Sequence, residues 1–133
     1  MLPFVLAAAL ASASPAPCRS DLLVANPRLK IVRARDRAFD NYIVTVEIKN
    51  RGVEAQPDGT QQHLELLQRG TVLGTQPIPV LGADEDYPAS FRLRLPHQSK
   101  RDPFPVEFRY VLDSKNGARA NCTSANDRLS ATL

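Results

Sequence analysis

Apolar and polar residues alternate one by one along several stretches of the chain, and this feature restricts the fold most. In YIVTVEIKN, residues 42–50, one side of the pattern is apolar, with Tyr42, Val44, Val46 and Ile48, and the other side carries Thr45, Glu47 and Lys49. A period of two is that of a β-strand with one buried face. The same pattern predicts strands over residues 28–37, 63–68, 71–76, 87–95, 106–113 and 128–133.

The chain gives no comparable signal for helices. No window sustains apolar residues at a spacing of 3.6, and the eleven prolines would interrupt long helices. About seven short strands separated by Gly, Pro and Asn clusters are typical of an antiparallel β-sandwich. We therefore predict an all-β fold in one domain that covers residues 21–133.

Turn signals add detail to this prediction. Asn50-Arg51-Gly52 ends one strand, and Gln68-Arg69-Gly70-Thr71 predicts a tight hairpin. Pro77 and Pro79 flank Ile78 and remove two backbone donors, which restricts that segment to a sheet edge or to a crossing between sheets. In the first predicted strand, Leu29 and Ile31 fit one face, and we expect the pattern to change near Val32.

The N-terminus resembles a signal peptide. An uncharged apolar run from Leu2 to Leu10 precedes Ala11-Ser12-Ala13, an A-x-A cleavage site. The run is about half the roughly 20 apolar residues that a membrane span needs. We expect residues 1–13 to be removed, residues 14–20 to lead the mature chain, and the protein to be periplasmic or extracellular with no transmembrane segment. The alternative is a buried hydrophobic N-terminal segment.

Two cysteines in an exported chain are expected to pair. A Cys18–Cys122 disulfide would close a loop of about 100 residues, worth about 4 kcal/mol in the chain-entropy model. It would also place the first and last strands near each other. No C-x-x-C motif is present, and only His63 and His97 could join the cysteines as metal ligands, which disfavours a redox or metal site.

The order of these segments resembles the CARDB domain, the cell-adhesion-related domain found in bacteria. The resemblance runs from about Asp21 to Leu133 and rests on Asn50-Arg51-Gly52 after a strand, on VLGTQPIPVLGA, and on Asp113 and Asn116 followed by Asn126-Asp127. It implies an immunoglobulin-like sandwich in an exported bacterial protein. The family supplies no catalytic residues to transfer to this chain.

The candidate ligand groups each have a simpler structural explanation. Asp84, Glu85 and Asp86 could help to bind calcium, but adjacent residues of an extended stretch point to opposite sides, so we interpret them as a solvated corner. Asp113, Asn116, Asn126 and Asp127 could form an oxygen-rich site if their loops meet, although turn formation explains them too. No nucleophile motif accompanies His63 or His97. We predict no catalytic residues, no metal site and no cofactor.

Among the features of the sequence, the outward-pointing arginines are the best indication of a binding partner. Arg92 and Arg94 alternate with core positions, and Arg33, Arg35 and Arg37 of the first strand could extend a basic face. Pairs such as Glu47 with Arg92 on neighbouring strands would instead neutralise that face within the protein. A net charge of +3, 6% aromatic residues and no Trp do not fit a nucleic-acid binder.

The leading hypothesis is a non-enzymatic binding or scaffolding module that acts through a protein partner. The alternative is a module that binds carbohydrate or a cell-envelope polymer. Sugar sites in sandwiches offer aromatic rings for stacking, which this chain is short of. An enzyme is the third possibility.

Overall fold

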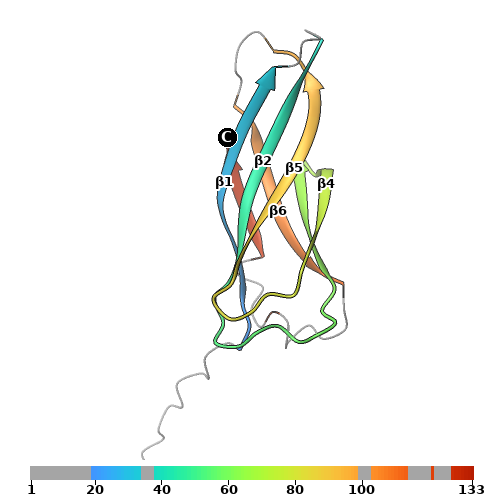
Figure 1. Ribbon diagram of the computed structural model, residues 1–133. Helices are drawn as coiled ribbons and strands as arrows, with labels where there is room; N and C mark the ends of the chain where they lie inside the picture. The colour runs from blue at the N-terminus through green and yellow to red at the C-terminus, as the bar shows by residue number, and fades with distance from the viewer. Residues whose placement is uncertain (1–18, 34–37, 99–102, 114–120, 122–126) are drawn as a thin grey trace, which may run out of the picture.

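The protein is a sandwich of two antiparallel sheets (Figure 1). The computed structural model describes residues 19–33, 38–98, 103–113, 121 and 127–133. Within them, one sheet has the order β1 (Leu22–Arg33), β2 (Phe39–Asn50), β5 (Asp86–Pro96), and the other β4 (Thr71–Ile78), β3 (Gln62–Gln68), β6 (Pro105–Leu112), β7 (Arg128–Thr132). These seven strands confirm the predicted all-β sandwich. None of the described residues forms a helix long and apolar enough to span a membrane.

The core lies between the sheets, where the alternating apolar residues meet. On β2, Val44, Val46 and Ile48 are at most 1% exposed, as their period of two predicts. Phe91 of β5 and Phe108 of β6 pack across the core with ring centroids 6.3 Å apart. The other fully buried apolar side chains include Leu22, Leu64, Leu66 and Leu81.

The first strand differs from the prediction. It begins at Leu22, six residues before the expected start, and its register shifts between Ala25 and Arg28. Asn26 has a φ of 54° at this irregularity. Pro27 follows it, and because proline has no N–H to donate to the ladder, it fits a position where the pairing is interrupted. The register then continues without a shift from Arg28 to Arg33. Val32 and Arg33 are both exposed, so the alternation of burial ends near Val32, where a change was expected.

The predicted hairpin and edge are confirmed. Arg69 and Gly70 have φ values of 50° and 79°, which are those of a type I′ turn between β3 and β4. β4 is the edge strand of its sheet and contains Pro77, which is exposed, and Ile78, which is buried. A proline in an edge strand hinders pairing with another chain, as expected.

The two ends of the described chain lie close together. β1 and β7 contact each other, and the Leu22 amide donates to Oδ1 of Asn121 over 3.1 Å. Cys18 and Cys122 lie outside the described residues, as do the predicted signal peptide and residues 14–18. The disulfide and the cleavage site therefore stay predictions.

Candidate binding surface

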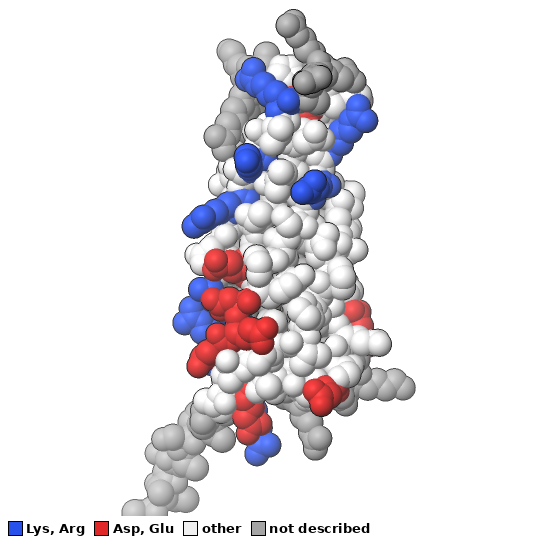
Figure 2. All heavy atoms as spheres, viewed as in Figure 1, with Lys and Arg blue, Asp and Glu red and all other residues white. Residues whose placement is uncertain are grey.

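The outer face of the β1–β2–β5 sheet carries charged residues in a regular order. Rows across the strands take one residue from each, and three successive rows are Val32–Asn41–Arg94, Lys30–Ile43–Arg92 and Arg28–Thr45–Ser90. We call the exposed residues Arg28, Lys30, Arg92 and Arg94 the basic half-face. Figure 2 looks onto this face and shows basic side chains gathered toward one end.

Within these three rows no residue is acidic. The cations lie on β1 and β5, on either side of the uncharged side chains of β2, and two strand spacings separate them by about 10 Å. The Arg94 guanidinium also lies 4.6 Å from the centre of the Phe39 ring, a cation–π contact. The half-face therefore combines positive charge with partly exposed apolar surface.

Acidic residues occupy the other half of the same face. Glu47 accepts a 2.7 Å hydrogen bond from Asn26, and this bond lowers the pKa of the Glu47 carboxyl. Lys49 lies 3.4 Å from Glu47 and 3.9 Å from Asp86. The expected pairing of Glu47 with Arg92 is wrong, because Glu47 lies opposite Pro88 and Arg92 opposite Ile43.

The structure separates the five arginines that were expected to share a basic face. Arg92 and Arg94 share the outer face of β5, which is adjacent to β2 as predicted. Arg33 follows Leu29 and Ile31 on the inner side of β1 and lines a cavity at the end of the sandwich. Arg35 and Arg37 lie outside the described residues. Arg28 and Lys30 were missed, although their alternation with Leu29 and Ile31 could have identified them.

The outer face of the other sheet is also charged, but its groups pair with each other. His63 lies 2.6 Å from Asp113 and 3.2 Å from Glu65, and Arg109 donates to Glu65 over 2.7 Å. Burial lowers the pKa of the His63 ring, but hydrogen bonds to Asp113 and Glu65 outweigh burial and raise it overall. The Arg109 hydrogen bond lowers the pKa of Glu65.

Among the remaining candidate ligand groups, Glu85 and Asp127 have structural partners. Asp84, Glu85 and Asp86 are exposed at a corner, where Glu85 accepts a 2.7 Å hydrogen bond from the Gly82 amide. Asp127 accepts a 2.7 Å hydrogen bond from Asn121, and burial raises the pKa of the Asp127 carboxyl. Asn116 and Asn126 lie outside the described residues. The described part of the chain holds no group of three or more His, Cys, Asp or Glu suited to a metal ion.

The two antiparallel sheets and their strand order define an immunoglobulin-like β-sandwich. The structure is similar to the crystal structure of the CARDB domain of a Pyrococcus furiosus protein in complex with di-metal ions, with a TM-score of 0.53 and 18% sequence identity over 86% of each chain. At this identity the similarity concerns the fold, and it confirms the expected CARDB-like sandwich. No protein-family model and no curated protein matches the chain significantly.

Proposed function

We propose that this domain is an exported, non-enzymatic binding module that docks an acidic surface of a partner protein on the basic half-face. The observation that carries the proposal is the arrangement of Arg28, Lys30, Arg92 and Arg94 in three rows that contain no carboxylate. Like charges held together on one surface attract a complementary partner and speed its approach.

A protein fits this surface better than a carbohydrate. Val32 and Phe39 are 40% and 37% exposed beside the cations, and protein interfaces combine apolar side chains with Arg in this way. A sugar site would instead need several exposed aromatic rings, whereas Tyr42 and Tyr110 are buried in the core. The basic half-face, three strands wide and three rows long, covers well under the roughly 800 Å² per partner of a stable complex. The interaction is therefore weak unless neighbouring surfaces of the domain also contact the partner.

Binding to the folded protein with and without the basic half-face tests the proposal. The protein serves as bait for periplasmic extract of its host, and each captured protein is purified and titrated. Substituting Ser for Arg92 and Arg94 is expected to weaken binding of the partner. Raising the salt concentration should reduce the difference in affinity between the wild type and this double variant. Arg128→Ser, at an exposed position on the other sheet, is the control. Equal affinity of the folded double variant would remove the basic half-face from the function.

Export is a separate part of the proposal and rests on residues 1–13. The intact mass of the protein isolated from its host should correspond to a chain that begins at Ser14. A chain that retains Met1 would contradict export by this route but would leave the binding surface unaffected.

A further inference from the structure

The two sheets differ in length, and a cavity lies where the longer one projects. β1, β2 and β5 have 12, 12 and 11 residues, whereas β3, β4 and β6 have 7, 8 and 8. Figure 1 shows the tips of the longer strands extending beyond the β3–β4 hairpin. The cavity at this end has a volume of about 470 Å³. This volume is within the range of small-molecule sites, about 300 to 1,000 Å³.

The floor of the cavity is fixed in place. The Phe104 ring stacks on Tyr42 with centroids 5.5 Å apart, and both side chains are buried. The backbone of Phe104 forms hydrogen bonds of 3.1 and 2.9 Å with Leu133, which join this segment to the end of β7. A ligand would therefore meet a preformed apolar surface, which reduces the cost of ordering the site on binding.

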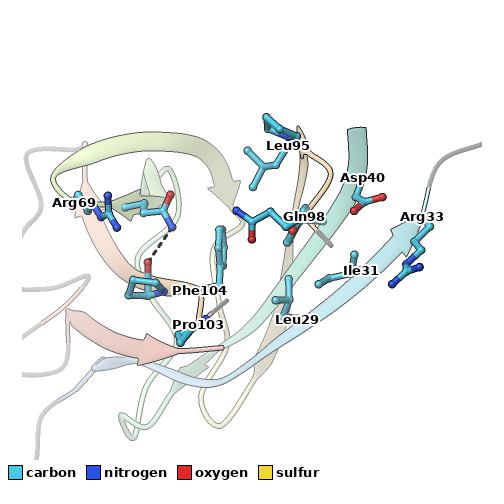
Figure 3. Close-up of a pocket in the computed structure, with 13 residues that line it drawn as sticks. Leu29, Ile31, Arg33, Asp40, Arg69, Leu95, Gln98, Pro103 and Phe104 are labelled. Carbon is cyan, nitrogen blue, oxygen red and sulfur yellow. Dashed lines mark hydrogen bonds between the residues drawn. The ribbon is translucent and has the colours of Figure 1, made fainter. Parts of the chain in front are cut away.

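One wall of the cavity changes from apolar to cationic along a single strand. Leu29, Ile31 and Arg33 alternate on the inner side of β1, about 6.6 Å apart, and the aliphatic pair is only half-buried. Leu95 of β5 lines the same cavity, and Figure 3 shows the Arg33 side chain beyond Ile31 at one end. Apolar surface that remains partly in contact with water favours an apolar ligand.

The carboxylate nearest to Arg33 in the ladder already has a partner. Asp40, which also lines the cavity, lies opposite Arg33 on β2, is 4% exposed, and its Oδ2 lies 2.8 Å from Nδ1 of His97. Arg69 of the β3–β4 turn lies at the other end of the cavity (Figure 3). Arg33 is therefore the cation that continues the aliphatic wall.

We propose that this end cavity binds a linear aliphatic carboxylate. Its hydrocarbon chain lies along Leu29, Ile31 and Leu95 over the Phe104 ring, and its carboxylate accepts hydrogen bonds from the Arg33 guanidinium. The order apolar, apolar, cation along β1 matches the order of such a molecule, tail first. Arginine is the side chain best suited to a carboxylate, because its planar fork donates two parallel hydrogen bonds. This site is separate from the basic half-face, which lies on the outer side of the same sheet.

A titration of the protein with decanoate below its micelle concentration, followed by ¹⁵N–¹H NMR, tests the proposal. Saturable shifts are expected at the amides of Leu29, Ile31, Leu95 and Phe104. Decanol, which has the same chain without the charge, should bind at least about tenfold more weakly, the factor that corresponds to one lost charge-assisted hydrogen bond. Shifts confined to Arg92 and Arg94 would overturn the proposal, because they would indicate attraction to the basic half-face.

Two matched variants locate the carboxylate. Arg33→Gln should reduce decanoate affinity at least about tenfold while leaving decanol affinity unchanged. Arg69→Gln, also at an exposed position on the cavity rim, should retain full affinity for both compounds. Equal decanoate binding by the wild type and Arg33→Gln would contradict the assignment, as would a loss in Arg69→Gln instead. Neither result would bear on partner binding by the basic half-face.

Discussion

At the scale of single residues, Asn50 organises the end of the sandwich opposite the cavity. Its side chain is 1% exposed, and Oδ1 accepts hydrogen bonds from the amides of Asp21 and Gly52 over 3.1 and 2.9 Å. Nδ2 donates to the carbonyl groups of Glu54 and Gly82 over 3.0 and 3.1 Å. The Asn-Arg-Gly signal thus marks a buried junction of three loops as well as a turn.

Gly52 is required at this junction for a steric reason. A Cβ at position 52 would lie 2.4 Å from both the carbonyl oxygen of Arg19 and the Cα of Ser20. Both atoms belong to the backbone, so neither can move away as the end of a flexible side chain would. The glycine therefore allows the segment before β1 to pack against the end of β2.

Asn50→Ala should be strongly destabilising. It leaves two amides and two carbonyl groups without this partner, and each unsatisfied buried group costs about 1 to 3 kcal/mol. Because some of these groups can reach water after relaxation, we expect a total loss of about 3 kcal/mol in the free energy of unfolding, measured by urea denaturation. Asn41→Ala, at an exposed position on the same strand, is the control. A loss below about 1 kcal/mol would show that the junction tolerates repacking.

His63 makes stability depend on pH. Its folded-state pKa is raised by Asp113 and Glu65, so the protonated ring favours the folded state. This contribution is fully present below the unfolded pKa of about 6.5 and is lost as pH rises through the higher folded value. The difference in unfolding free energy between the wild type and His63→Gln should therefore be largest near pH 5.5 and decline toward pH 9. A difference that is constant with pH would mean that the ring is not protonated in this cluster.

At the scale of elements, the register of β5 on β2 decides which residues form the core and which form the binding surface. Phe91 pairs with Val44 on the inner side, and Arg92 pairs with Ile43 on the outer side. A slip by one residue would exchange the two faces along the whole strand.

Substitutions on opposite faces of β5 should differ sharply in effect. Phe91 is 2% exposed and contacts Phe108, so Phe91→Ala should cost about 3 to 5 kcal/mol through the cavity that it creates. The Arg92→Ser and Arg94→Ser double variant should change stability by about 0.5 kcal/mol or less per site. Chemical denaturation measures both. Similar losses in the two variants would be inconsistent with this register.

At the scale of the whole molecule, contacts between the first and last strands close the sandwich. Asn121 accepts a hydrogen bond from the Leu22 amide and donates one to Asp127, so it links the start of β1 to the residue before β7. Asn121 directly precedes Cys122, and Leu22 follows Cys18 by four residues. The disulfide between the two cysteines stays a prediction.

The predicted Cys18–Cys122 disulfide has two measurable consequences. The protein isolated from its host should show no free thiol before reduction, and Cys122→Ala should reduce the free energy of unfolding by about 2 to 5 kcal/mol. Cys18→Ala should cost the same, and the double variant no more than either single one, because all three remove one bond. Two reactive thiols per chain would disprove the bridge.

The sequence alone determined the presence of the strands, their buried faces and the exposed edge, but not where β1 begins. These properties are local: alternation identifies the inner face of β2, and Pro77 excludes a central position for β4 wherever the other strands lie. The type I′ turn is local as well, because Arg69 and Gly70 are adjacent and Gly tolerates positive φ.

Only the tertiary structure decided which side chains lie beside one another. Glu47 and Arg92 were expected to pair, yet Glu47 lies opposite Pro88 and Arg92 opposite Ile43. The sequence could not show this, because a shift of register by an even number of residues leaves every inward and outward assignment unchanged. Alternation therefore cannot show which residues of neighbouring strands lie side by side. The pairing of β1 and β5 with β2 places Arg28 and Lys30 on the same face as Arg92 and Arg94. Arg33 was separated from them because the irregularity of β1 lies before Arg28 and not near Val32. The end cavity likewise depends on the unequal lengths of the two sheets, which no single strand encodes.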